Sequence, residues 1–130
     1  MVSKEALIQR WETNRPFADV VANIEAKTPE HQFRVLAVHD VQATLHEKGL
    51  EREPLKIIEV CNAGFAHKAL QKDVDVSVFM PCRFVVYTEG GKTHLLLSRP
   101  SMIAGMLPEA GLNELASDVE RTLKKIAEES

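Results

Sequence analysis

The chain has 130 residues, of which 45% are hydrophobic and 27% charged, and its formal net charge is −3. This length and composition predict one soluble globular domain over residues 1–130, and the acidic balance gives no reason to expect nucleic acid or a membrane surface as a partner. No apolar run approaches the roughly 18–20 residues that a membrane span requires, and the N-terminus lacks the basic and apolar regions of a signal peptide. We therefore expect a cytoplasmic protein, in which two cysteines are more often free thiols than a structural disulfide.

The first third of the chain predicts two helices and a strand. Ser3 is a suitable N-cap for a helix that extends to about Trp11 along a rough apolar stripe. Pro16 suits the first turn of a second helix, which we expect to end near Lys27. The β-branched and apolar residues from Phe33 onward predict a strand.

The rest of the chain alternates strands and short helices. Asp40 can cap a helix that ends at Gly49, residues 55–60 predict a strand, and residues 62–72 predict another helix. Residues 73–80 read as a strand or an extended segment. Gly90 and Gly91 permit the tight turn of a β-hairpin over residues 82–99. A short apolar helix follows, and the last helix carries an apolar stripe of Leu112, Leu115, Val119, Leu123 and Ile126.

This order of elements predicts the fold class. Strands joined by a hairpin, with helices grouped on one face, are typical of an α+β domain with two layers. We expect a curved antiparallel sheet with helices packed on one face.

Cys61 is the first candidate for chemistry, because it lies where a strand leads into a helix. The free N–H groups and the positive end of the helix dipole favour a thiolate at such a position. Asn62 directly follows and can orient a ligand. His67 lies six residues along the chain, nearly two helical turns away, which makes direct contact with Cys61 improbable in a straight helix.

Cys82 is the second candidate and follows Pro81 at the start of a strand. Ends of neighbouring strands meet in a sheet, so Cys82 and Cys61 can lie close together. Free cysteine is also one of the most often buried residues, and both a working site and simple core packing are open. No zinc-ligand spacing, phosphate loop, dinucleotide motif or nucleophile elbow is present.

Several segments together resemble a known family. The stretches "FRVLAVHDVQATLHEKG" and "IIEVCNAGFAHKALQKDVDVSVFMPCRFVVYTEGGKTHLLLSRP" and the last helix are similar to the bacterial and archaeal family known as domain of unknown function 302. The resemblance extends from about Pro16 to Ile126, and its most specific parts are Cys61–Asn62 and Pro81–Cys82. The family usually has proline where Ala63 stands here. The resemblance leaves residues 1–15 as an N-terminal helical extension and residues 16–130 as the family core.

The resemblance implies a fold like that of the TATA-binding protein and assembly into homodimers, but no established activity. Some members occur beside sulfur-oxidation and thiol-handling proteins, which points to sulfur metabolism. Both cysteines of this chain fall on cysteine positions of the family.

Three functions are open at this point. The first is a homodimeric binding module in which Cys61, Cys82, Asn62 and Pro81 hold a soft ligand: a sulfane sulfur, a thiol compound, haem, or a metal such as copper with the two cysteines as ligands. The second is a thiol-dependent transferase or redox enzyme in which Cys61 attacks and Cys82 resolves. The third is a structural or interaction protein whose cysteines pack in the core.

Overall fold

The computed structural model describes residues 2–130. Its helices, strands and 3₁₀ turns follow one another as α1 (Lys4–Leu7), β1 (Ile8–Thr13), α2 (Phe17–Glu30), β2 (Arg34–Asp40), α3 (Val41–His46), β3 (Leu55–Cys61), α4 (Ala63–Lys72), η1 (Val74–Phe79), β4 (Cys82–Glu89), β5 (Lys92–Ser98), α5 (Pro100–Met106), η2 (Pro108–Ala110) and α6 (Asn113–Glu128). No helix among residues 2–130 is both long enough and apolar enough to cross a membrane.

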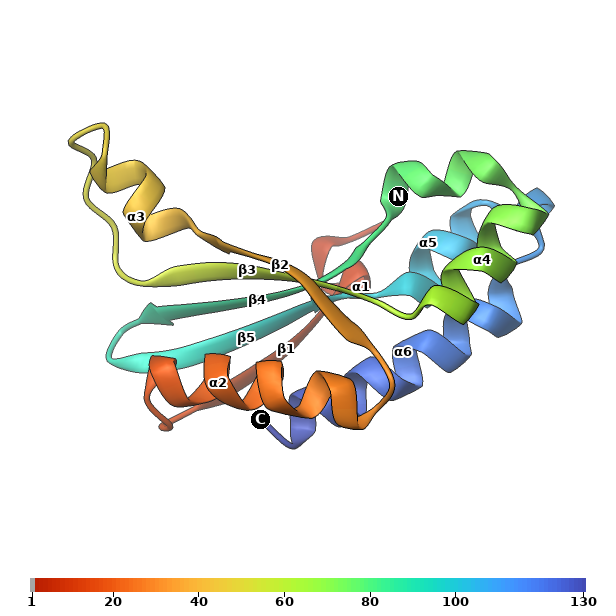
Figure 1. Ribbon diagram of the computed structural model, residues 1–130. Coiled ribbons are helices and arrows are strands. Elements are labelled where there is room, and N and C mark those ends of the chain that lie inside the picture. Colours follow the sequence, from red (N-terminus) through yellow and green to blue (C-terminus); the bar gives the residue numbers. More distant parts are fainter. Residues whose placement is uncertain (1) are drawn as a thin grey trace.

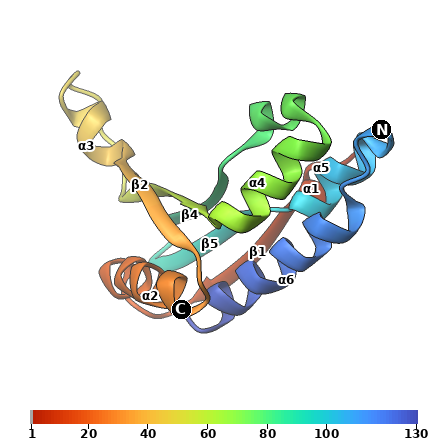
Figure 2. The same ribbon diagram turned by 45° about the vertical axis from the view of Figure 1, so that its right-hand side comes forward.

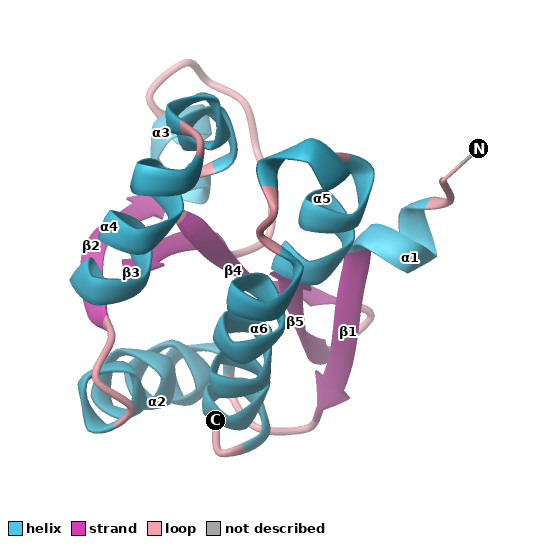
Figure 3. Ribbon diagram, turned by 90° about the vertical axis from the view of Figure 1, so that its right-hand side faces the viewer, coloured by secondary structure: helices cyan, strands magenta, loops and turns pink. Residues whose placement is uncertain are grey.

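The strands form one open sheet in the order β1-β5-β4-β3-β2, and every neighbouring pair is antiparallel. Helices α2, α4, α5 and α6 lie on the same side of this sheet, whereas α3 extends beyond its end (Figures 1 and 2). Figure 3 shows the layer of helices in front of the strands. The predicted α+β fold, with helices on one face of an antiparallel sheet, is confirmed.

Alternation along the central strands builds the main core. Successive side chains of a strand point to opposite faces, so every second residue meets the helices. These strand residues are Ile58, Val60, Phe84, Val86, Leu95 and Leu97, and they pack against Val20, Val21 and Ile24 of α2 and Val119, Leu123 and Ile126 of α6. The last helix and its apolar stripe are therefore as predicted.

Two local predictions are confirmed by cap and turn geometry. The Asp40 carboxylate accepts a hydrogen bond from the Ala43 N–H at 3.0 Å and so caps α3. Gly90 and Gly91 join β4 to β5 with φ angles of 61° and 75°. Both values lie in the left-handed region that a primed hairpin turn requires and that glycine adopts without strain.

The predicted helix over residues 3–11 is wrong after its first turn. Ser3 does cap a helix, but that helix ends at Leu7, and residues 8–13 form the edge strand β1 beside β5. Trp11 lies opposite Leu95 and packs against the main core. Pairing with a long neighbouring strand outweighs a weak local helix preference here, and these residues are part of the sheet rather than an extension to it.

The predicted strand over residues 73–80 is also wrong. Val74–Phe79 forms a 3₁₀ turn, which begins where the Asp73 carboxylate accepts from the Asp75 N–H at 3.0 Å. Only Val76 of this turn is buried. The alternating valines suggested a strand, but the Asp73 cap offers the backbone a turn instead.

A buried carboxylate joins α6 to the segment between β5 and α5. Glu120 is 5% exposed and accepts hydrogen bonds from the guanidinium of Arg99 and from the backbone and hydroxyl of Ser101. Burial alone would raise the pKa of Glu120, but the hydrogen bonds from Ser101 and Arg99 outweigh it and keep this pKa below its usual value. The Arg99 guanidinium also donates to the Ala6 carbonyl, so one network ties three segments together.

Replacing Arg99 should destabilise the fold. Arg99→Met keeps most of the side-chain volume but removes two hydrogen bonds from the buried carboxylate, and we expect urea denaturation to show a loss of about 1–3 kcal/mol in the free energy of unfolding. Arg121→Met is the control, because its pair with Asp118 is exposed and should be worth less than about 1 kcal/mol. Equal losses in the two variants would contradict this role of the network.

Candidate functional site

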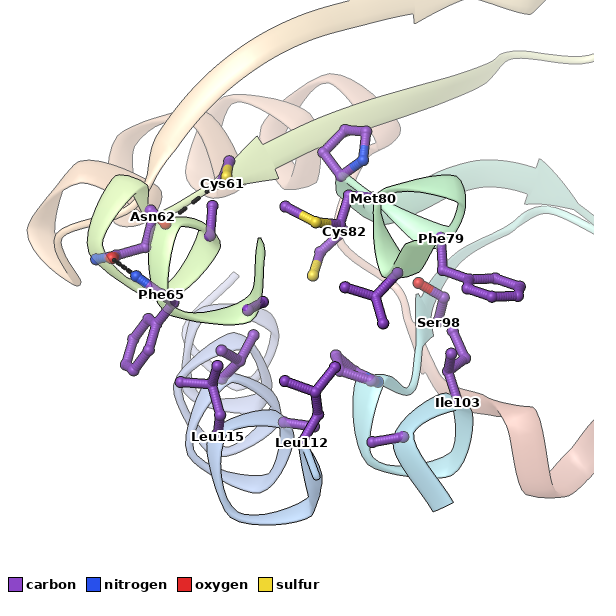
Figure 4. A pocket seen from close by; sticks show the side chains of 18 of the residues that line it. Cys61, Asn62, Phe65, Phe79, Met80, Cys82, Ser98, Ile103, Leu112 and Leu115 are labelled. Carbon is purple, nitrogen blue, oxygen red and sulfur yellow. Dashed lines mark hydrogen bonds between the residues drawn. The ribbon is translucent and has the colours of Figure 1, made fainter. Parts of the chain in front are cut away.

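A pocket of about 120 Å³ lies between the main core and a second, smaller apolar cluster. The second cluster is built from α5, η1, η2 and the beginning of α6 around Val76, Ala104, Ala110, Leu112 and Ala116. The sheet contributes the ends of β3, β4 and β5, and α4 forms a further wall (Figure 4). The lining residues are Phe33, Val60, Cys61, Asn62, Phe65, Ala66, Ala69, Val76, Phe79, Met80, Pro81, Cys82, Ser98, Pro100, Ile103, Ala104, Leu107, Leu112, Leu115, Ala116 and Val119.

The chemistry of this lining is apolar and neutral. Apart from the two thiols, Asn62 and Ser98 are the only side chains with a polar group among the lining residues that the structure describes, and none of those residues carries a charge. A charged ligand buried here would lose its hydration without gaining a counter-ion. The pocket therefore fits a neutral ligand.

The fold brings all four predicted site residues to this pocket. Cys61 is the last residue of β3 and Cys82 the first of β4, two strands that pair with each other, and Asn62 and Pro81 are their neighbours in sequence. The register places Cys82 opposite Val60, so the two cysteines are offset by one position. Both are free thiols, and Figure 4 shows the Cys82 sulfur directed into the cavity.

The expected thiolate at Cys61 is not supported. Burial raises the pKa of the Cys61 thiol above its usual value. Burial also raises the pKa of Cys82 to about 11, with a further increase from nearby Cys61 and a partial decrease from Arg83. The thiol of Cys61 lies 3.7 Å from the Asn62 carbonyl, to which it donates, and the helix N–H group of Phe65 is capped by the Asn62 side chain. Desolvation is the largest cause of both increases, and both thiols are protonated at neutral pH.

Asn62 serves the local structure with both ends of its amide. Its Oδ1 accepts from the Phe65 N–H at 2.9 Å, which caps α4, and its Nδ2 donates to the Gln32 carbonyl at 2.8 Å. Gln32 has a φ of 64°, a conformation that side chains other than glycine rarely adopt. Asn62 thus fixes the start of α4 against the turn between α2 and β2.

Two polar residues close to the cysteines in the sequence, His67 and Arg83, do not line the pocket. His67 is exposed and is absent from the lining, in agreement with its expected distance from Cys61. Arg83, which follows Cys82 in β4, pairs with Glu59 across a distance of 3.7 Å and is not part of the pocket wall. Within residues 2–130, no group of three or more His, Cys, Asp or Glu side chains could hold a metal ion.

The sequence gives no indication of the far wall of the pocket, which α5, α6 and Leu112 form. The sequence pattern assigns Leu112, Leu115 and Val119 only to the stripe of an amphipathic helix, and Ala104 and Ala116 carry no signal that would place them at a site. Their small or ordinary apolar side chains are what any core contains. Only the placement of α5 and α6 shows that they enclose a cavity.

The raised pKa values predict slow alkylation of both cysteines. An increase in the pKa of Cys82 from 9.0 to about 11 lowers its thiolate fraction at pH 7 about 100-fold. We expect mass spectrometry after iodoacetamide treatment to find Cys82 labelled at least about 100-fold more slowly than in the urea-unfolded chain, with Cys61 intermediate and both rates increasing up to pH 10. A Cys61 that reacts faster in the folded than in the unfolded protein would contradict the raised pKa.

Asn62 should stabilise the fold through its two hydrogen bonds, one with the Phe65 N–H and one with the Gln32 carbonyl. Asn62→Ala removes the cap of α4 and the bond to Gln32, and we expect it to lower the free energy of unfolding by about 1–3 kcal/mol. Asn62→Asp keeps a capping oxygen and should lose less. If thermal or urea unfolding gives the two variants the same stability, the cap contributes nothing.

Comparison with known proteins supports the family resemblance. The model of the family described as "Domain of unknown function DUF302" matches residues 9–130, so the match includes most of β1, which the sequence had assigned to an extension. No curated protein is similar enough to count as a match. The structure is similar to the crystal structure of an uncharacterized conserved DUF302 protein from Bacillus stearothermophilus, with a TM-score of 0.89, 31% identity, and coverage of 95% of this chain and 97% of that chain. The chain therefore belongs to the DUF302 family of proteins of unknown function.

Proposed function

We propose that this protein is a binding module for a small, neutral molecule that carries a soft atom, in particular a thiol or a neutral sulfane-sulfur compound. The observation that carries this proposal is the composition of the pocket wall. Cys61, Cys82 and Met80 place three sulfur-bearing side chains around a cavity that is otherwise apolar. Such a ligand would give the protein a role in sulfur metabolism.

The size of the pocket supports a small ligand. Its volume of about 120 Å³ is close to that of an apolar cavity of roughly 150 Å³ that stays dry and binds benzene. Pockets for drug-sized molecules or cofactors enclose about 300–1,000 Å³. A short sulfur chain or a compact thiol is of the right size, whereas haem is not.

The sulfur atoms give the pocket a preference for soft ligands, in addition to the preference for apolar ligands that the rest of its wall provides. Thioether and thiol sulfurs are polarizable and make favourable contacts with other soft groups. The two thiols are protonated at neutral pH, so they can meet a neutral sulfur compound without a charge to desolvate. Asn62 supports this wall by fixing α4, and its own amide is already used by the backbone.

The other functions have less support. An enzyme in which Cys61 attacks needs a thiolate or a base, but the pKa of Cys61 is raised and no histidine lies among the lining residues that the structure describes. A metal held by Cys61 and Cys82 would lack further ligands of the usual types, because no third His, Cys, Asp or Glu within residues 2–130 joins them. The packing function, in which the cysteines only fill space, is the direct alternative that the experiment must separate.

A matched pair of ligands tests the proposal. Tetrahydrothiophene and tetrahydrofuran are neutral five-membered rings that differ only in sulfur against oxygen. We expect amide NMR titrations to show that both rings bind near α4 and the beginning of α6. Tetrahydrothiophene should bind more tightly than tetrahydrofuran, by a larger factor than its lower polarity explains. In Cys61→Ala/Cys82→Ala, that preference for sulfur should decrease about threefold to tenfold, corresponding to lost sulfur contacts of roughly 1 kcal/mol.

A blocked pocket is the matched control. Ala69→Leu adds three carbons to a side chain that lines the cavity and leaves both cysteines in place, so both rings should lose binding together. If the ratio of the two affinities is the same with and without the cysteines, the thiols act as packing residues. If neither ring shifts pocket resonances in the native chain, the binding proposal fails.

A further inference from the structure

We propose that η1 is a lid of the pocket, which opens when Val74–Phe79 changes from its 3₁₀ turn to an extended conformation. This inference rests on the proposed function only in one respect, that a bound ligand must enter and leave the cavity. The opening itself is a property of the chain without a ligand, and it is tested without one.

The η1 turn covers one side of the cavity with Val76 and Phe79, which both line it. Residues three apart in a 3₁₀ helix lie on the same face, so a single face of η1 is directed to the pocket. Val76 is 7% exposed, whereas Phe79 is 47% exposed and lies at the border of the cavity (Figure 4). Among the lining residues that the structure describes, Phe79 is the only large apolar one with such exposure. The cavity is therefore closest to solvent at η1.

Only one side chain anchors η1. Val76 is the single buried residue of the turn and packs in the smaller apolar cluster, while Val74 is 66% exposed and Val78 is 77% exposed. Within residues 2–130, no hydrogen bond joins Val74–Phe79 to another helix or to a strand. Segments with few buried apolar contacts and only local hydrogen bonds open at a low cost in free energy.

The other walls of the pocket are held more firmly. The last helix, α6, packs its apolar stripe against the sheet and α2, and its Glu120 binds the segment that leads into α5. The hydrogen bonds of an antiparallel ladder join β3 to β4. Helix α4 is held at its beginning by the Asn62 amide and by the contact of Phe65 with Phe33. The wall that opens first is therefore η1.

The sequence of η1 gives it a second conformation. Val74, Val76 and Val78 occupy alternate positions, and β-branched residues prefer an extended backbone. The 3₁₀ turn leaves two of these valines in solvent, so the local preference and the fold disagree. Such disagreements are expected at functional or strained segments. Because the fold offers no strand to pair with these residues, the extended form stays the minor one.

A change to the extended form would uncover the cavity. A 3₁₀ helix rises about 2.0 Å per residue and a strand about 3.3 Å, so six residues would become longer by roughly 8 Å. The two ends of η1 are held by α4 and β4, and the cavity of about 120 Å³ is too small to receive the extra length. The segment would therefore bulge into solvent and carry Val76 and Phe79 away from the pocket.

Hydrogen exchange tests the opening, because the same substitution should act in opposite directions at different positions. The probe is the Met80 N–H, which donates to the Ser77 carbonyl at 3.1 Å in the closed turn. Val76→Ala removes most of the anchor and should lower the protection of this amide at least about tenfold. Val74→Ala/Val78→Ala removes two exposed β-branched side chains, favours the turn, and should raise the protection about threefold to tenfold.

Val38→Ala is the matched control. Val38 is also an exposed valine, at 37%, but it lies in β2, so this variant should leave the protection of the Met80 amide as it is. The amides of α6 report unfolding of the whole chain. In the native protein, the Met80 amide should exchange faster than they do.

Alkylation of Cys82 tests whether this opening gives access to the cavity. The Cys82 sulfur is directed into the pocket, so in a Cys61→Ala background its labelling by iodoacetamide reports entry of a small neutral molecule (Figure 4). We compare labelling rates among the η1 variants at one pH, since the same thiol reacts in each. Val76→Ala should speed labelling and Val74→Ala/Val78→Ala should slow it, by factors similar to those seen for the Met80 amide.

Three results would overturn the proposal. The first is a Met80 amide as well protected as the amides of α6. The second is a change in the same direction for Val76→Ala and for Val74→Ala/Val78→Ala. The third is labelling of Cys82 that does not follow the exchange of the Met80 amide. Failure of tetrahydrothiophene to bind would contradict the proposed function alone, because neither measurement here uses a ligand.

Discussion

Helix α6 packs against two separate groups of apolar side chains, and the rest of the structure depends on how it does so. Toward its end, Val119, Leu123 and Ile126 face the sheet and α2. Near its beginning, Leu112 and Ala116 belong to the smaller cluster with α5 and the 3₁₀ turns. One helix thus ties together two cores, and the small alanines of the second core do not fill the space between them. The pocket is a consequence of that incomplete filling.

The helix is held in place by more than apolar contact. Glu120, on the same helix, is buried at the junction and receives hydrogen bonds from Arg99 and Ser101. A buried carboxylate without such partners would be an uncompensated charge and would strongly destabilise the fold. The network therefore holds α6 against the segment that leads from β5 into α5. Both α5 and α6 line the pocket.

The two cysteines show how burial can reverse an expectation drawn from local structure. The end of a strand followed by a helix N-terminus is a place where a thiolate is usually stabilised. Here Asn62 occupies the cap position with its own side chain, and the surrounding side chains are apolar. Desolvation then dominates and raises the pKa of both thiols. The tertiary environment, and not the local motif, therefore decides the direction of these pKa shifts.

The sequence by itself determined the elements whose local signals agree with their surroundings. The Asp40 cap, the Gly90–Gly91 hairpin, the stripe of α6 and the family resemblance could all be predicted because each rests on a few adjacent residues or a fixed period. The sequence permitted the meeting of Cys61 and Cys82 at one end of the sheet but did not require it, because only the structure shows that β3 and β4 are neighbours.

Only the tertiary structure decided the rest. Residues 8–13 became a strand because β5 offered a partner for Trp11 and its neighbours, and residues 74–79 became a 3₁₀ turn because no strand was placed to pair with them. The pocket itself needs α4, α5 and α6 around the cysteines, and the direction of the pKa shifts depends on how completely those helices exclude water. Distances between segments far apart in the chain fix both properties, and no local pattern encodes such distances.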